Sequence, residues 1–384
     1  MWLDGIRVLE AAFLLPVPYA TQLLTDLGAE VVKVEQPDGG DPARGYPPFD
    51  EDGTSRLFAS LNTDKRSVAI DLEVETGQDA LANLLEDIDV VIEGFRPGVA
   101  ADLGLDAESV HAVDQDIVHC SLSGYGQTGS RAAWPGHDLT FGAFTGLVDM
   151  TRSGPEEPPV IPGYPVGDMA GGLFAAMSVL GALLGEESRT TIDIGISDVL
   201  TSFSLPVAIE AFEGERPRPG RTILTGGEPW YDIYETADGR YVALAALERR
   251  FWRDFCIAVD RSDLIEMHGM TDHDELERLR VELEALFERR TAEEWMDLLG
   301  GDLPIERVQS VSEVLNHPHT RDRGLIDHGQ VDRFLPPMRT SVPFAETSPP
   351  PRLGEHSRLE LERVGVEPTE LDELIAEGTL VDGA

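Results

Sequence analysis

A histidine in a short polar loop is the first candidate for proton chemistry. His137 lies in the segment Trp134–Asp138, immediately before an apolar stretch. An unperturbed imidazole titrates near neutral pH, so a histidine presented to a cleft could act as a general acid or base. His137 is one of nine histidines, and a structural or surface role is the alternative.

A second candidate is the aspartate at the start of a long apolar segment. Asp168 follows Gly167 and precedes a predicted helix, Met169–Leu184, that is apolar nearly all round. An ordinary N-cap is one interpretation. The functional interpretation places the carboxylate at a cleft, with nearby backbone N–H groups stabilising an oxyanion. Gly171 and Gly172 would allow close approach of a substrate or of another helix.

A third acid, Glu248, follows a predicted β-hairpin and begins a helical pattern. A solvated glutamate at a helix start is the simple explanation. A role in the chemistry of the site is the alternative, and the local sequence leaves both open.

Basic residues are informative in so acidic a chain. Lys33 and Lys65 are its only lysines, and Arg66 and Arg96 also fall in the first hundred residues. All four lie near predicted strand ends. Asn62, Lys65 and Arg66, and the segment 93–98 with Arg96, are predicted loops where the phosphates of a nucleotide cofactor could be bound. Salt bridges to the surrounding acids are the alternative.

Alternating strands and helices dominate the first half of the chain. This pattern predicts an α/β layer with a parallel sheet and helices on both faces. No G-x-G-x-x-G turn follows the first strand, so a nicotinamide site is not indicated. The predicted strands are 6–11, 30–34, 67–72, 90–94, 117–121 and 191–196, and the predicted helices are 20–27, 77–88, 169–184 and a last one reaching Phe212.

The second half predicts a smaller α+β domain. Residues 213–227, rich in proline and glycine, indicate a linker. A hairpin signal around Ala237–Asp238–Gly239 and three helical patterns, at 249–258, 274–289 and 292–299, follow it. We expect a large domain formed by residues 1–212 and completed by 320–384, and a small domain over 228–319.

Charge and cysteine content restrict the class of protein. The formal net charge is −41, from 71 acids and 30 bases, which argues against nucleic acid or anionic membranes as partners. Acid excess with so little lysine suggests a halophilic protein in a high-salt cytoplasm, where salt screens the repulsion. An acidic mesophilic protein is the alternative. Cys120 and Cys256 have no disulfide or metal-ligand spacing, so no metal is expected. The apolar stretch 173–185 is too short to span a bilayer, and a cytoplasmic location is predicted.

Several motifs, in order, resemble a known enzyme family. Gly136–His137–Asp138–Leu139, Val166–Gly172 and Gly226–Tyr231 are the central ones, and flanking segments at 26–35, 94–98, 236–239 and 353–357 also fit. Together they are similar to the 2-methylacyl-CoA racemases of the class III, formyl-CoA transferase-like, CoA-transferase superfamily. The resemblance extends to both ends of the chain.

This resemblance implies a fold and a site. The implied fold is a Rossmann-like large domain plus a small domain in an interlocked homodimer, with CoA against the large domain. His137 and Asp168 match the racemase acid–base pair, and Glu248 matches the glutamate that orients the histidine. The reaction implied is inversion of the carbon next to the thioester carbonyl, with a role in lipid metabolism. It needs no cofactor beyond the CoA moiety of the acyl-CoA substrate.

A CoA-transferase is the main alternative, because Asp168 also matches the nucleophilic aspartate of the transferases. Two features favour the racemase: a histidine at 137, where transferases usually carry an aromatic residue, and a glycine-rich loop reduced to Gly226–Gly227. Pro16–Val17–Pro18 and Leu303–Arg307 depart from the racemase pattern and leave the acyl chain open. A non-catalytic CoA-binding regulator is a third possibility.

Overall fold

The computed structural model describes residues 1–185, 187–329, 331–341 and 347–383. Its contacts divide the chain into two compact units. The first comprises Met1–Thr145, Gly163–Phe203 and Pro318–Ala384, and the second comprises Gly146–Pro162 and Ser204–His317. The sequence placed the boundary after residue 212, whereas the units divide after Phe203 and an excursion at 146–162 joins the second unit.

A seven-stranded sheet forms the centre of the first unit, with the order β12-β3-β2-β1-β4-β5-β6. All neighbouring strands are parallel except β12, which runs antiparallel to β3 at the edge. The expected α/β fold with a mostly parallel sheet is therefore confirmed. The strands are β1 (Arg7–Ala11), β2 (Glu30–Glu35), β3 (Arg66–Ile70), β4 (Val90–Glu93), β5 (Val118–Ser123), β6 (Thr191–Gly195) and β12 (Leu380–Val381).

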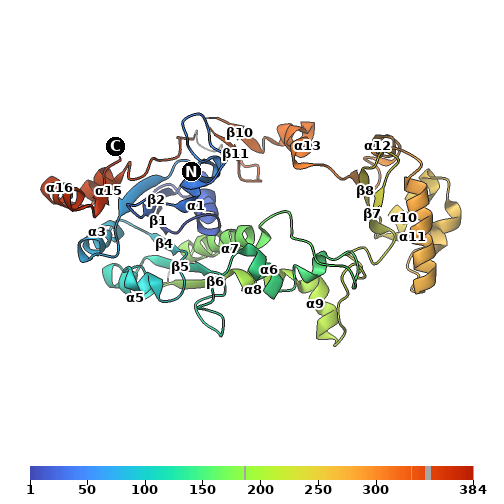
Figure 1. Ribbon diagram of the computed structural model, residues 1–384, viewed down its shortest axis with the longest axis horizontal. Coiled ribbons are helices and arrows are strands. Elements are labelled where there is room, and N and C mark those ends of the chain that lie inside the picture. Colours follow the sequence, from blue (N-terminus) through green and yellow to red (C-terminus); the bar gives the residue numbers. More distant parts are fainter. Residues whose placement is uncertain (186, 330, 342–346, 384) are drawn as a thin grey trace. The chain divides into compact units, whose positions relative to one another are not determined.

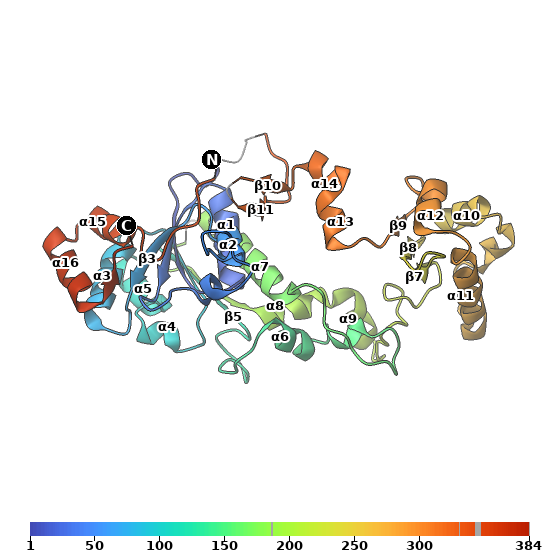
Figure 2. The ribbon, with the colours of Figure 1, turned by 45° about the horizontal axis from the view of Figure 1, so that its top comes forward.

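Helices cover both faces of this sheet. Alternate residues of β1 face opposite sides, since Leu9 joins a core with α3, α5, α15 and α16, whereas Glu10 faces α1. Figure 1 shows α1 and α7 side by side, and Figure 2 shows α3, α15 and α16 grouped together. The helices are α1 (Pro16–Asp26), α2 (Arg56–Leu61), α3 (Glu75–Leu85), α4 (Val99–Asp102), α5 (Ala107–Val113), α6 (Asp138–Phe144), α7 (Val166–Leu183), α8 (Ile196–Phe203), α14 (Pro318–Arg323), α15 (Ser357–Arg363) and α16 (Pro368–Glu377).

Helix α7 packs on α1 through small residues. A Cβ added at Gly172 would lie 2.4 Å from the carbonyl oxygen of Pro16 at the start of α1, so only glycine permits this approach. A Cβ at Gly171 would meet Ile196. Helix packing is therefore what these two glycines provide. By length and composition α7 could cross a membrane, which corrects the expectation of too short a segment, although 39% of its most apolar window is buried in the protein.

The second unit contains a three-stranded antiparallel sheet, β7-β8-β9, covered by helices. Its core is rich in aromatic residues, among them Trp252, Phe255, Phe287 and Trp295. The predicted hairpin is present, and Ile305–Arg307 adds a third strand that the sequence did not indicate. The elements are α9 (Leu205–Phe212), β7 (Tyr231–Glu235), β8 (Tyr241–Ala245), α10 (Arg249–Ala258), α11 (His273–Phe287), α12 (Ala292–Leu299), β9 (Ile305–Arg307) and α13 (Val311–Asn316).

Short elements complete both units. The helix expected to run unbroken to Phe212 is divided at Ser204 into α8 and α9. Within the first unit, β10 (Ile326–His328) and β11 (Asp332–Phe334) form a separate antiparallel pair. The 3-10 turns are Pro42–Gly45, Asp149–Thr151 and Ser262–Met267.

Candidate functional site

The order of the strands places a topological switch point between β1 and β4 in the first unit. From β1, the chain continues to β2 and β3 on one side and later to β4, β5 and β6 on the other. Ligands of open parallel sheets bind at such a switch point, outside the carboxyl ends of the strands. The loops that follow β1 and β4 lie there, and the second contains Arg96, which is exposed. Within the described parts of the chain, the Arg96 side chain makes no hydrogen bond or ion pair.

Asp138 ties the loop of His137 to the start of α7. One carboxylate oxygen, Oδ1, accepts the backbone N–H groups of Gly167 at 2.7 Å and Asp168 at 3.0 Å. A Cβ at Gly167 would lie 2.9 Å from this oxygen, so glycine leaves room for the contact. Asp138 is the first residue of α6, directly after His137. The structure thus brings the backbone around His137 next to that of Asp168.

Asp168 is the third residue of α7 rather than its N-cap, because the helix begins at Val166. Burial, and secondly the negative charge of Asp138, raise the pKa of Asp168 from 3.8 to about 7. Such a carboxyl group exchanges protons readily at neutral pH. A perturbed carboxyl beside a second acid is typical of catalytic sites, since their surroundings separate the pKa values of neighbouring groups.

The expected oxyanion role of the α7 backbone is not supported. The N–H groups of Gly167 and Asp168 donate to Asp138, and that of Met169 donates to the carbonyl oxygen of Pro165 at 3.1 Å. The N–H of Val166 donates to Tyr164 at 2.9 Å. Since each of these donors already has a partner within the chain, none is left for an enolate oxygen.

His137 is exposed, and its backbone is fixed on both sides. Its N–H donates to Thr140 Oγ1 at 3.0 Å, and its carbonyl oxygen accepts from that hydroxyl at 2.8 Å. The ring of Phe141 lies under the loop, since a Cβ at Gly136 would be 2.3 Å from it. A held backbone with an exposed imidazole suits contact with a bound molecule.

Glu248 belongs to the second unit, whereas His137 and Asp168 belong to the first. Glu248 precedes α10, is exposed, and makes no side-chain capping bond. His268 Nε2 donates a hydrogen bond to the carbonyl oxygen of Leu247 at 3.0 Å, which fixes the backbone directly before Glu248. Its predicted role, orienting His137, stays a prediction.

Three of the predicted CoA contacts lie in a buried ionic cluster around Glu10. Lys33 Nζ donates to Glu10 Oε1 at 2.5 Å and pairs with Asp41 at 2.9 Å. Lys65 Nζ donates to Glu10 Oε2 at 2.8 Å and to Asn62 Oδ1 at 3.0 Å. All five side chains are buried. A phosphate could reach Lys33, Lys65 or Asn62 only if this cluster opened, so their visible role is structural.

Charge coupling in the cluster sets its protonation. Burial alone would raise the pKa of Glu10, but the two lysines lower it to about 2. Burial and the neighbouring Lys33 lower the pKa of Lys65 to about 8, despite the opposing effect of Glu10. For Lys33, Glu10 and Asp41 outweigh burial and raise the pKa. The carboxyl group of Glu10, on β1, is therefore ionised and paired with lysine at neutral pH.

Arg66, a further predicted CoA contact, is half-exposed and pairs with acids. It contacts Glu30 at 2.8 Å and also pairs with Glu360 of α15. Of the predicted phosphate contacts, Arg96 is thus the one whose charge has no ion-pair partner among residues 1–185, 187–329, 331–341 and 347–383. Binding of CoA by Asn62, Lys33, Lys65, Arg66 and Arg96 stays a prediction.

Sequence reasoning missed the role of Asp138. An acid directly after His137 and at a helix start was visible, but its contact with Asp168 spans 30 residues and depends on the packing of α6 against α7. Among the described residues, no group of three or more histidines, cysteines or acids could hold a metal ion. Cys120 and Cys256 are buried and unpaired.

Comparison with known proteins settles the family. The model of CoA-transferase family III matches residues 3–357. The chain belongs to CoA-transferase family III. It is 31% identical to the succinyl-CoA:mesaconate CoA-transferase of Haloarcula hispanica over 95% of this chain and 96% of that protein. It is 30% identical to the human alpha-methylacyl-CoA racemase over 97% of this chain and 96% of that protein.

Solved structures agree with this family. The crystal structure of a CAIB/BAIF family protein from Brucella suis superposes with a TM-score of 0.81 at 27% identity, covering 94% of this chain and 99% of that one. The α/β architecture described above is thus that of the family. The family includes both transferases and a racemase, so membership alone leaves the reaction open.

Proposed function

We propose that this chain is a racemase that inverts the carbon next to the carbonyl of a 2-methylacyl-CoA thioester. The observation that carries the proposal is the carboxyl group of Asp168, whose pKa is raised to about 7 beside the loop of His137. A general acid–base catalyst works best when its pKa lies near the working pH. A carboxylate that attacks a thioester is instead favoured by full ionisation.

In the proposed mechanism, His137 and Asp168 act on opposite faces of the α-carbon. The thioester carbonyl acidifies the α-hydrogen. One residue removes that proton, an enolate forms, and the other residue delivers a proton to the opposite face. The roles exchange with the configuration of the substrate. The enolate oxygen must be stabilised by groups other than the first-turn amides of α7, which are occupied.

Asp138 acts as a positioning residue in this scheme. Its carboxylate holds the first turn of α7, and its negative charge contributes to the raised pKa of Asp168. Glu248 would hold the imidazole of His137 in its working tautomer, as the resemblance to racemases implies.

The CoA moiety would lie at the switch point between β1 and β4. Arg96 offers an unpaired guanidinium there, and planar guanidinium groups bind phosphate oxygens through paired hydrogen bonds. No cofactor beyond this CoA moiety enters the proposed reaction.

A homodimer is also part of the proposal. Helix α7 exposes Leu173 and Met177, which are 51% and 54% accessible. Large apolar side chains exposed on one helix are typical of a surface that another chain covers. Sedimentation analysis in concentrated KCl tests this: the proposal expects twice the mass of the chain, and a monomer at all concentrations contradicts it.

We keep the cytoplasmic location and the adaptation to salt as proposals, supported by the net charge of −41. The same charge opposes partners such as nucleic acid or anionic membranes.

A CoA-transferase is the second candidate, and the relationship to the mesaconate transferase of Haloarcula hispanica favours it. Asp168 would then attack the donor thioester, releasing CoA thiolate and forming a mixed anhydride. CoA thiolate would attack the anhydride to give an aspartyl-CoA thioester, and an acceptor carboxylate would take over the CoA by the same steps. His137 would only position the substrate.

One experiment separates the two candidates. The protein is incubated in concentrated KCl with one enantiomer of a 2-methylacyl-CoA, with and without a carboxylic acid acceptor such as succinate. The racemase proposal expects the second enantiomer to appear at the same rate in both samples. New CoA thioester on the acceptor, without inversion, would overturn it in favour of the transferase.

A further inference from the structure

Arg131, in the loop after β5, lies over aromatic rings. Its guanidinium carbon lies 4.3 Å from the centre of the Trp134 ring and 4.2 Å from that of Phe144, with Tyr125 at 6.0 Å. In the described parts of the chain, its side chain makes no hydrogen bond or ion pair. Its positive charge is therefore positioned by aromatic rings alone.

Many arginines of this acidic chain pair with carboxylates, as Arg7 and Arg66 do, whereas Arg131 contacts aromatic rings. Rings that stack on the faces of a guanidinium leave its N–H groups, which point outward in the plane, without acceptors. Trp134 and Phe144 are 53% and 49% exposed, so the stack is open to solvent. The outward edge of Arg131 is available for a planar oxyanion.

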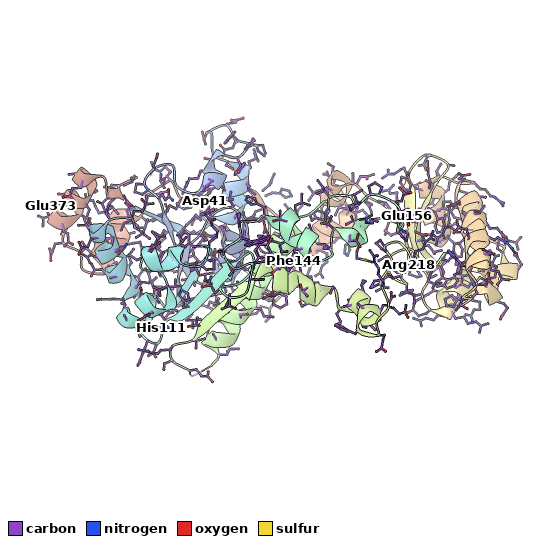
Figure 3. The ribbon with its side chains drawn as sticks, turned by 60° about the horizontal axis from the view of Figure 1, so that its bottom comes forward. Asp41, His111, Phe144, Glu156, Arg218 and Glu373 are labelled. Atoms are coloured by element: carbon purple, nitrogen blue, oxygen red, sulfur yellow. The ribbon has the colours of Figure 1, made fainter. Side chains whose placement is uncertain are left out.

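The stack adjoins the site of Asp168 within the same unit. Tyr125 packs on Phe144 at 5.8 Å and on Phe141 at 5.2 Å between ring centres, and Phe141 supports the loop of His137. Phe144, labelled in Figure 3, ends the helix that begins at Asp138. Six residues of α-helix rise about 9 Å, so the ring under Arg131 lies roughly that far along α6 from Asp138.

The rise of about 9 Å along α6, from Asp138, which contacts the backbone of Asp168, to Phe144, whose ring contacts Arg131, is close to the length of a short dicarboxylic acyl group. Five bonds of an extended chain span about 6 Å, and a hydrogen bond adds about 3 Å. The CoA phosphates are assigned to the switch point near Arg96, after β4. Arg131 follows β5, which is the next strand after β4 in the order of the sheet. Its guanidinium contacts Phe144 at the end of α6. With the CoA phosphates bound near Arg96, the anion left for Arg131 would be a carboxylate on the acyl group.

We propose that Arg131 binds the distal carboxylate of a dicarboxylic acyl group whose thioester carbonyl lies beside Asp168. This inference rests on the proposed function, because it assumes that the acyl group occupies the site of Asp168. The substrate class is then a 2-methyl dicarboxylic acyl-CoA of about four or five main-chain carbons rather than a long branched fatty acyl-CoA.

The test compares two thioesters that differ only in the distal group: 2-methylglutaryl-CoA, which carries a carboxylate, and 2-methylpentanoyl-CoA, which carries a methyl group. For wild type and for Arg131→Met, kcat/KM for inversion and Kd by calorimetry are measured with both. The loss of a charge-assisted pair should lower the preference for the dicarboxylic thioester about 10- to 100-fold in both measurements. Arg131→Lys, which lacks the planar fork, should lower it less.

Control variants and alternative results keep the inference separate from the proposed function. Arg56→Met, at an exposed arginine of α2, should leave the preference as in wild type. If Arg131→Met weakens the binding of both thioesters equally, Arg131 contacts a CoA phosphate and the inference is overturned. If the variant changes neither kcat/KM nor Kd, the inference is overturned as well. If wild type inverts neither thioester, the racemase proposal fails, and the ratio of the two Kd values still decides whether Arg131 binds the carboxylate.

Discussion

Replacing Asp168 by asparagine should stabilise the protein at neutral pH while it removes activity. The carboxyl of Asp168 has a folded-state pKa of about 7 against an ordinary value of 3.8. The folded state therefore keeps a proton that the unfolded chain has already released. Between these two values the wild type loses stability as the pH rises, and above pH 7 it carries the full cost of a buried carboxylate.

The size of the effect follows from the pKa difference. About three pH units correspond to roughly 4 kcal/mol, and we expect about 2–4 kcal/mol because Asp168 is only partly buried. Asp168→Asn has no proton to lose. At pH 8 its free energy of unfolding should exceed that of wild type by about 2–4 kcal/mol. At pH 5 this difference should be about 2 kcal/mol smaller.

Urea unfolding followed by far-ultraviolet circular dichroism, in concentrated KCl between pH 5 and pH 8, measures the difference. Asp297→Asn, an exposed acid of α12, is the matched control and should show no such trend. If the stability difference between Asp168→Asn and wild type stays constant with pH, the carboxyl is not perturbed and the reasoning about Asp168 is wrong.

Three other outcomes are expected. His137→Ala should lower the rate of inversion about 10²- to 10⁴-fold with thermal stability unchanged, and a chiral assay that still finds inversion would exclude His137 as acid or base. Glu10→Gln leaves two buried ammonium groups without their shared carboxylate and should cost about 3–5 kcal/mol in urea unfolding, whereas Glu73→Gln at an exposed site should cost almost nothing. Activity should fall when KCl is diluted, because the charge of −41 is then unscreened, and full activity in dilute buffer would contradict this.

Much of the order of strands and helices was predictable because the longer elements carry their own periodicity. Helix α3 buries Ala80, Leu81 and Leu84 on one face, and the inner strands β2 and β4 are rich in valine and isoleucine. Elements defined only by tertiary pairing were missed. β12 pairs with β3 some 310 residues away, and β9 is three residues long, so neither has a local pattern.

The site was predictable in part, for a similar reason. His137 and Asp168 carry local signals, and their proximity is set by Asp138, whose role appears only when α6 meets α7. Lys33 and Lys65 were expected near strand ends, where a phosphate could contact them. Both side chains instead contact the carboxylate of Glu10. The alternation of β1 directs Glu10 to the face of the sheet where the two lysines lie, and a buried charge requires a partner.

The central claim is transfer of a proton to the α-carbon from solvent-exchangeable groups of the enzyme. The most direct measurement is the deuterium content at C2 of each enantiomer after one pure enantiomer reacts in D2O. The account predicts that every inverted molecule carries one deuteron at C2, whether or not an acceptor acid is present. Inverted product that retains its original hydrogen, or no inversion while CoA moves to an acceptor, would contradict it.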